Sequence, residues 1–216
     1  MKIVCFGYRR WAINIYNNIK LHTDNEIFIY KNKKDLSHKV VKKKKPELIL
    51  FYGWSWIIPK KIYQNYNCLM LHPSDLPKFR GGSPIQNQII RGLEETKVTI
   101  FRINEIIDGG NILYKKKLSL KGEISDIFKR IEIIGLQLTL KILKSKYKET
   151  PQDHSNASYF KRLTDNSELT LDEIKNKNST YIYNKIRMLT DPYPNAYIKT
   201  KDNKKILIKS VKLEKK

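Results

Sequence analysis

The stretch ELILFYGWSWIIPKKIYQNYNCLMLH (residues 47–72) places two apolar runs on either side of a short predicted helix. The first run, 47–53, is almost continuously apolar, which is typical of a strand buried on both faces of a parallel sheet. A helix is predicted over 59–66, and residues 68–72 form the next predicted strand. Strand–helix–strand order at this pace favours an α/β sheet.

The residues upstream repeat this alternation. Strands are predicted over 2–7 and 26–30, and the helix predicted from Trp11 carries an apolar side chain at every fourth position. The charged residues 34–45 form a second predicted helix, which ends before Pro46 because proline disfavours helix in its predecessor. We therefore predict an α/β fold with a Rossmann-like, doubly wound and mostly parallel sheet.

The residues downstream continue the pattern after a loop rich in Pro and Gly (73–82). The next helix opens at Ser83-Pro84, a capping residue followed by proline at the first helical position. Two further strands are predicted over 97–103 and 111–120. A long helix is predicted over 123–146, because its Ile and Leu side chains recur at helical spacing.

The sequence becomes more polar beyond the long helix. Residues 149–170 are predicted to form a crossing loop with one aromatic anchor, Tyr159-Phe160. A helix over 171–189 and two closing strands, NAYIKT and KILIKSVKL, are predicted to follow, with a hairpin turn between the strands. We therefore predict a core over 1–148 and a C-terminal extension of loop, helix and β-hairpin over 149–216.

The net charge of +22 raises the question of a nucleic-acid partner. Lys is spread along the whole chain and accompanies heavy use of Ile, Asn and Tyr, a composition that AT-rich coding sequences produce. No zinc-finger spacing, recognition-helix signature or RNP-type aromatic strand accompanies the charge. We therefore expect no specific nucleic-acid partner.

The apolar runs are too short for a membrane span, which needs ~20 residues, or for an export signal. Cys5 and Cys68 both fall within predicted strands, which indicates reduced core thiols. We expect a cytoplasmic protein with no membrane partner and no metal.

Two residues stand where chemistry is expected. His72 ends a predicted strand just before the glycine loop, the position where open α/β sheets place ligands. The alternative is a histidine that merely caps the strand. Asp108 lies in NEIIDGG between two predicted strands, and the alternative there is an aspartate that stabilises a tight turn.

The element RGGSPIQ (80–86) exposes backbone amides at a helix N-terminus, where glycines allow close approach of a polar ligand. No Gly-Lys-Ser/Thr follows, and the single Gly7 after the first strand excludes the GxGxxG fingerprint. Arg9 and Arg10, in the turn after Gly7, are candidates for holding a phosphate.

The runs LMLHPSDLPKFRGGSPIQNQIIRG and KVTIFRINEIIDGGNIL together resemble the 10-formyltetrahydrofolate-dependent formyltransferases, most of all the sugar N-formyltransferases. The family signature is Asn-x-His-Pro-Ser-x-Leu-Pro, then Arg-Gly-(Gly/Ala)-x-Pro-Ile-Gln. A catalytic Asp follows 36 residues after the His, and Asp108 stands at that distance from His72. GWSWIIPKKI resembles the folate-site segment. YFKRLTDNSEL and IRMLTDPYPNAYI resemble the closing segments of members that act on amino sugars.

The resemblance implies three groups of site residues. The expected catalytic positions are His72, Asp108 and Met70, which stands where the family has Asn. The expected contacts to 10-formyltetrahydrofolate are Trp54, Ile58, Pro59, Asp108 and Gly109. The expected contacts to the acceptor substrate are Ser74, Arg80, Gly81, Gly82, Gln86, Arg9 and Arg10.

Met70 departs from the family pattern at a position that matters. In the mechanism that the resemblance implies, the Asn and the His donate hydrogen bonds to the oxyanion while the Asp manages protons. A thioether cannot donate. Three alternatives remain open: Ser74, Asn87 or an ordered water replaces the donor; the enzyme is slow and relies on His72; or activity has been lost.

The chain length favours a nucleotide-linked amino sugar, a dTDP- or UDP-linked amino-dideoxyhexose, as the acceptor. Methionyl-tRNA formyltransferases normally add a C-terminal barrel, and glycinamide ribonucleotide formyltransferases have a phosphate loop where this chain has GYRRW. By analogy with the sugar enzymes we expect a homodimer. The rival hypotheses are a binding protein on the same fold without turnover and, last, a basic nucleic-acid-binding protein.

Overall fold

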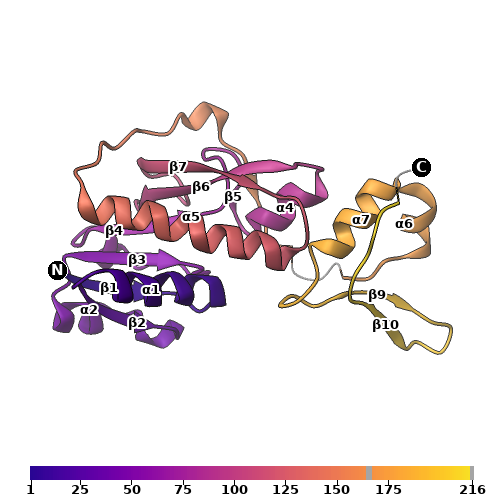
Figure 1. Ribbon diagram of the computed structural model, residues 1–216, viewed down its shortest axis with the longest axis horizontal. Coiled ribbons are helices and arrows are strands. Elements are labelled where there is room, and N and C mark those ends of the chain that lie inside the picture. Colours follow the sequence, from indigo (N-terminus) through magenta and orange to yellow (C-terminus); the bar gives the residue numbers. More distant parts are fainter. Residues whose placement is uncertain (164–166, 215–216) are drawn as a thin grey trace.

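The computed structural model describes residues 1–163 and 167–214. Its centre is a six-stranded sheet in the order β2-β1-β3-β4-β6-β7 (Figure 1). The strands of this sheet are β1 (Lys2–Phe6), β2 (Glu26–Tyr30), β3 (Leu48–Tyr52), β4 (Cys68–His72), β6 (Glu95–Arg102) and β7 (Ile112–Ser119). The four strands from β2 to β4 are parallel, whereas β6 and β7 pair antiparallel. The predicted α/β, mostly parallel sheet is confirmed.

Helices cover both faces of the sheet. The α-helices of the core are α1 (Arg10–His22), α2 (His38–Lys44), α3 (Lys60–Tyr63), α4 (Pro84–Ile90) and α5 (Ile124–Lys144), and a 3-10 turn, η1, spans Lys33–Asp35. Side chains alternate between the faces, so Ile3 and Cys5 pack under α1 and α5, whereas Val4 and Phe6 pack with α2 and α3. Strands β1 and β3 are therefore buried on both faces, as their continuous apolar runs require.

The C-terminal part begins with a segment that runs back along the core. Its elements are η2 (His154–Asn156), β8 (Tyr159–Phe160), α6 (Leu171–Asn176), α7 (Ser179–Arg187), β9 (Ala196–Lys199) and β10 (Lys205–Ile208). Strand β8 pairs with β5 (Arg80–Gly81), whereas Leu169, Ile186 and Ala196 form a small apolar cluster of their own. Figure 1 shows α6, α7 and the β9–β10 hairpin as an appendage at one end of the core. The predicted hairpin is confirmed, and the boundary after residue 148 stays a prediction.

Two predicted helices are each interrupted. The segment predicted as helical over 34–45 is split into η1 and α2, because the Ser37 side chain accepts a hydrogen bond from the amide of Val40 and starts a new helix. The predicted helix over 171–189 is likewise split, with the Asn178 side chain capping α7. Short polar side chains satisfy the first amides of a helix, so they favour a start where periodicity alone predicts continuation.

Both cysteines lie in the sheet as free thiols, and Cys5 has no exposed surface. Burial raises the pKa of Cys68 to about 12, so its sulfur stays protonated and unreactive at neutral pH. Within the described residues, no helix is long and apolar enough to cross a membrane.

The hydroxyl of Tyr16 joins β1 to β3 inside the core. It lies 2.9 Å from the Phe6 carbonyl and 3.2 Å from the Leu50 carbonyl, and it accepts a hydrogen bond of 2.7 Å from the amide of Tyr52. These contacts occur where the two strands end next to the loops that carry site residues.

We expect Tyr16→Phe to lower the free energy of unfolding by about 1–3 kcal/mol, because the buried Tyr52 amide loses its partner. Urea denaturation monitored by circular dichroism measures this change. Tyr66→Phe serves as the control, since the Tyr66 hydroxyl makes no hydrogen bond to any described residue. Equal stability of the two variants would contradict the role of Tyr16.

Candidate active site

A cavity of about 710 Å³ lies beside the carboxyl end of β4, where β3 and β4 give way to their loops. His72 is the last residue of β4 and is only 5% exposed. Met70 lies two residues earlier on the same side of the strand and also lines the cavity. The end of a parallel strand next to a change in sheet direction is the usual ligand position in α/β folds.

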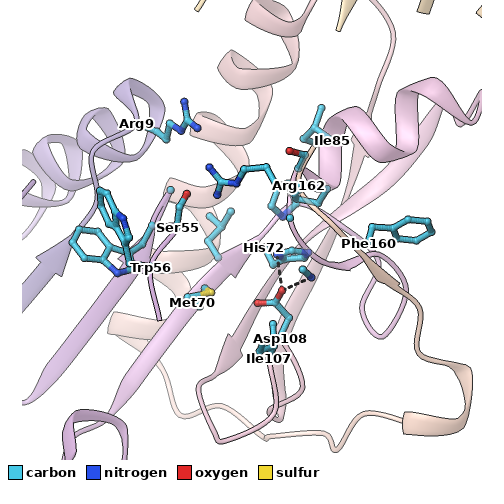
Figure 2. A pocket seen from close by; sticks show the side chains of 18 of the residues that line it. Arg9, Ser55, Trp56, Met70, His72, Ile85, Ile107, Asp108, Phe160 and Arg162 are labelled. Atoms are coloured by element: carbon cyan, nitrogen blue, oxygen red, sulfur yellow. Dashed lines mark hydrogen bonds and ion pairs between the residues drawn. The ribbon is translucent and has the colours of Figure 1, made fainter. Parts of the chain in front are cut away.

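His72 and Asp108 lie together in this cavity (Figure 2). The Nδ1 atom of His72 is 3.6 Å from Oδ2 of Asp108, and the side chains are 7% and 10% exposed. The same Oδ2 accepts a hydrogen bond of 2.8 Å from the amide of Gly81. Asp108 has a φ of 50°, in the left-handed region that aspartate tolerates better than most residues. The turn thus presents the carboxylate to the glycine loop and to His72 at once.

The ring orientation of His72 is set by the carbonyl of Phe79, which lies 2.8 Å from Nε2. A carbonyl oxygen only accepts hydrogen bonds, so Nε2 carries a proton in this arrangement. In the neutral ring Nδ1 is then a proton acceptor, held next to Asp108. His72 therefore donates a hydrogen bond to a ligand through Nδ1 only after that nitrogen has gained a proton.

The glycine loop is shaped for close backbone contact with the crossing loop. Gly81 has a φ of 93°, and a Cβ there would lie 2.5 Å from the carbonyl oxygen of Phe160. A Cβ on Gly82 would lie 2.5 Å from the amide nitrogen of Arg162. The two glycines are thus required for packing between segments about eighty residues apart in the sequence, and this packing brings Arg162 into the cavity.

The structure gathers most of the expected site residues around one cavity and leaves others outside its wall. The expected residues that line it are His72, Asp108, Met70, Trp54, Ile58, Gly81, Gly82, Gln86 and Arg9. The expected residues that do not line it are Pro59, Gly109, Ser74, Arg80 and Arg10.

Arg80 and Ser74 have structural partners in place of ligand contacts. The Arg80 side chain is completely buried and donates to Gln152 and to the hydroxyl of Tyr159, so it fastens the crossing loop to the core. Ser74 is also completely buried, and its hydroxyl donates to the carbonyl of Lys78 at 2.8 Å. Neither side chain lines the cavity, and the contacts to substrate that we expected from the sequence stay predictions.

Asn87 is not free to replace the missing Asn donor either. Its amide nitrogen donates to the carbonyls of Gly82 and Lys161, at 2.9 and 3.1 Å. With Ser74 equally engaged, neither side chain that we considered from the sequence has a free donor. Breaking one of these hydrogen bonds to serve a ligand would leave a buried carbonyl unpaired, which costs free energy.

Two other donors in the cavity wall have no partner among the described residues: Nε1 of Trp54 and Nε2 of Gln86. Trp54 is 8% exposed and Gln86 is 4% exposed. A buried donor without a partner costs stability, so each of these N–H groups calls for an acceptor that the described residues do not supply, either an ordered water or a bound ligand.

The sequence did not single out Arg162, Tyr193 or Trp56, all of which line the cavity. Trp56 packs edge-on against Trp54, with ring centroids 4.7 Å apart. It lies within GWSWIIPKKI, whose resemblance to the folate-site segment already pointed to this part of the cavity. Arg162 lies within YFKRLTDNSEL, one of the segments that resemble the sugar enzymes, but one more cation is inconspicuous in a chain of net charge +22. Only the fold of the crossing loop brings it to the site.

Comparison with known proteins identifies a family and several relatives that match this chain. The family model described as formyl transferase matches residues 14–131. A methionyl-tRNA formyltransferase from Wolbachia pipientis subsp. Culex pipiens is 33% identical over 178 residues, which cover 79% of this chain and 56% of that protein. The chain spans about half the length of the curated relatives that it matches.

Solved structures agree with this match. The methionyl-tRNA formyltransferase from Clostridium thermocellum has a TM-score of 0.84 at 34% identity, covering 96% of this chain and 97% of that chain. A 4-N formyltransferase from Francisella tularensis has a TM-score of 0.75 at 22% identity, covering 99% and 98%, and shows the shared fold. Because the family model matches more than half of its residues, the chain belongs to the formyl transferase family.

Proposed function

We propose that this protein transfers a formyl group from 10-formyltetrahydrofolate to the amino group of a nucleotide-linked amino sugar. The observation that carries the proposal is the His72–Asp108 pair, held at 3.6 Å inside the large cavity next to the glycine loop. Ligand cavities of a few hundred Å³ or more with a few converging polar groups are typical of small-molecule sites.

The side of the cavity formed by the loop after β3 fits the folate. Trp54, Trp56 and Ile58 supply aromatic and aliphatic surface, and the unpartnered Nε1 of Trp54 supplies a donor for a polar ring edge. Ile57 and Ile107, from two different loops, also line the cavity and are 87% and 61% exposed. Apolar side chains exposed at a cavity mouth are typical of ligand contacts.

His72 and Asp108 have separate roles in the proposed reaction. When bound, 10-formyltetrahydrofolate supplies a formyl group that forms a C–N bond to the acceptor amine as its bond to the donor nitrogen breaks, and one proton passes from acceptor nitrogen to donor nitrogen. Nδ1 of His72 accepts the proton that leaves the amine, next to the Asp108 carboxylate, which stabilises the resulting imidazolium. Oδ1 of Asp108, which accepts no hydrogen bond from the described residues, orients the amine.

Methionyl-tRNA is the second candidate acceptor, because the relatives at 33–34% identity carry that name. Chain length does not exclude this acceptor, contrary to what we expected from the sequence, because the match covers 97% of the Clostridium chain. The amino-sugar proposal is supported instead by the resemblance of YFKRLTDNSEL and IRMLTDPYPNAYI to the closing segments of sugar enzymes.

The test is a panel of acceptors incubated with the protein and 10-formyltetrahydrofolate. We expect a mass gain of one formyl group on a dTDP- or UDP-linked amino sugar, and none on methionyl-tRNA or glycinamide ribonucleotide. Formylation of methionyl-tRNA alone would overturn the amino-sugar assignment and keep formyl transfer. Folate binding without any formylated product would favour the hypothesis of a binding protein.

Two further expectations belong to this proposal. We propose a homodimer, supported by Ile206 and Leu207 of the hairpin, which are 53% and 52% exposed on an edge strand. We propose a cytoplasmic location, supported by the two free thiols of Cys5 and Cys68.

A further inference from the structure

Two arginines enter the cavity from segments far apart in the sequence. Arg9 precedes α1, whereas Arg162 belongs to the crossing loop that packs on Gly82. Both line the cavity that holds His72 and Asp108. Figure 2 shows both guanidinium groups extending into the same part of the cavity, on the side away from Trp56 and Met70.

The Arg9 side chain is held in place by aromatic rings. Its guanidinium carbon lies 5.0 Å from the ring centre of Tyr8 and 5.3 Å from that of Tyr193. These contacts restrict the side chain without neutralising it, because an aromatic ring carries no net charge. Within 1–163 and 167–214, neither Arg9 nor Arg162 forms an ion pair with a carboxylate.

The positive end of α1 points to the same place. Arg9 is the N-cap residue of this thirteen-residue helix, and its side chain makes no capping hydrogen bond. The first amides of a helix favour an anion, and the two guanidinium groups add two full charges. Guanidinium groups bind phosphate oxygens through paired hydrogen bonds, so two of them match a group with two phosphates.

We propose that Arg9 and Arg162 together bind the diphosphate of the acceptor and thereby select a nucleoside-diphosphate-linked amine. The inference rests on the proposed function for the identity of the acceptor. A second cavity of about 380 Å³ adjoins the first and shares Gln86, Tyr193 and Leu163 with it. A long acceptor thus has room beyond the reaction centre, on the side of α4 and α7.

Arg10 provides a matched control for the proposed binding of phosphate by Arg9. Arg10 is exposed, lies outside the wall of both cavities and directly follows Arg9. Arg10→Met therefore removes the same charge as Arg9→Met, at almost the same distance from the N-terminus of α1. A general effect of net charge on nucleotide affinity would appear in both variants, whereas a direct contact to phosphate is lost only in Arg9→Met.

The experiment measures the dissociation constant of UDP and of dTDP by isothermal titration calorimetry, with no formyl donor present. We expect Arg9→Met and Arg162→Met each to weaken binding roughly 10- to 100-fold, the usual loss for a charge-assisted hydrogen bond, and Arg10→Met to leave it unchanged. Uridine and thymidine, which lack phosphates, should bind all four proteins equally. This result supports the proposal even if no amino sugar is formylated.

Three outcomes would overturn it. One is unchanged UDP and dTDP binding in both variants, whether or not the wild-type protein formylates an amino sugar. The second is an equal loss in Arg10→Met, which would assign the effect to net charge. The third is weakened binding of tetrahydrofolate with unchanged nucleotide binding, which would assign Arg9 and Arg162 to the folate glutamate.

Discussion

His72→Asn is expected to lower kcat for formyl transfer by roughly 10²–10⁴, the usual contribution of a positioned acid–base group. The reason is geometric: Nδ1 of His72 is the ring atom left for proton transfer, because Nε2 is bound to the Phe79 carbonyl at 2.8 Å. An Asn side chain keeps a polar group at this position but accepts no proton at neutral pH. Steady-state kinetics with the acceptor found in the panel measure the change.

The control for this substitution is His38→Asn, an exposed histidine on α2 that does not line the cavity. It should leave kcat unchanged. Tetrahydrofolate should bind His72→Asn and the wild-type protein with similar affinity, because the proposed folate wall of Trp54 and Ile58 is untouched. Wild-type kcat in His72→Asn would exclude the acid–base role, and loss of folate binding would show that the substitution disturbs the cavity itself.

Met70→Asn is expected to raise kcat, by up to about 10²–10³, the factor that one oxyanion donor typically contributes. Met70 lines the cavity two residues before His72 and offers no hydrogen bond. Ser74 and Asn87, the side chains considered as replacements, already donate to backbone carbonyls. An Asn amide at position 70 therefore supplies a donor that these side chains do not.

Met70→Leu is the matched control, because leucine has a similar volume and likewise has no hydrogen-bond donor. We expect its kcat to equal that of the wild-type protein. An unchanged kcat in Met70→Asn would show that another donor already serves the site. A loss of activity in Gln86→Leu or Trp54→Phe would then identify the donor, since both residues have an unpartnered N–H in the cavity wall.

The order of strands and helices followed from local pattern. Continuous apolar runs such as 48–52 predict strands buried on both faces, and the long stripe over 124–144 predicts a helix packed along the sheet. Boundaries that depend on a single capping side chain, at Ser37 and Asn178, did not follow, because periodicity carries no information about caps.

The sequence by itself determined the α/β fold, because its continuous apolar runs require strands that are buried on both faces. The pairing of His72 with Asp108 was predicted from the resemblance to the formyltransferases, in which the two residues stand at this separation. Only the tertiary structure decided which other residues share their cavity. It placed Arg162 in the wall and Arg80 and Ser74 behind it, through the packing of the crossing loop on two glycines. Contacts between segments so distant in sequence depend on how the chain folds back on itself, and no local pattern of residue types encodes them.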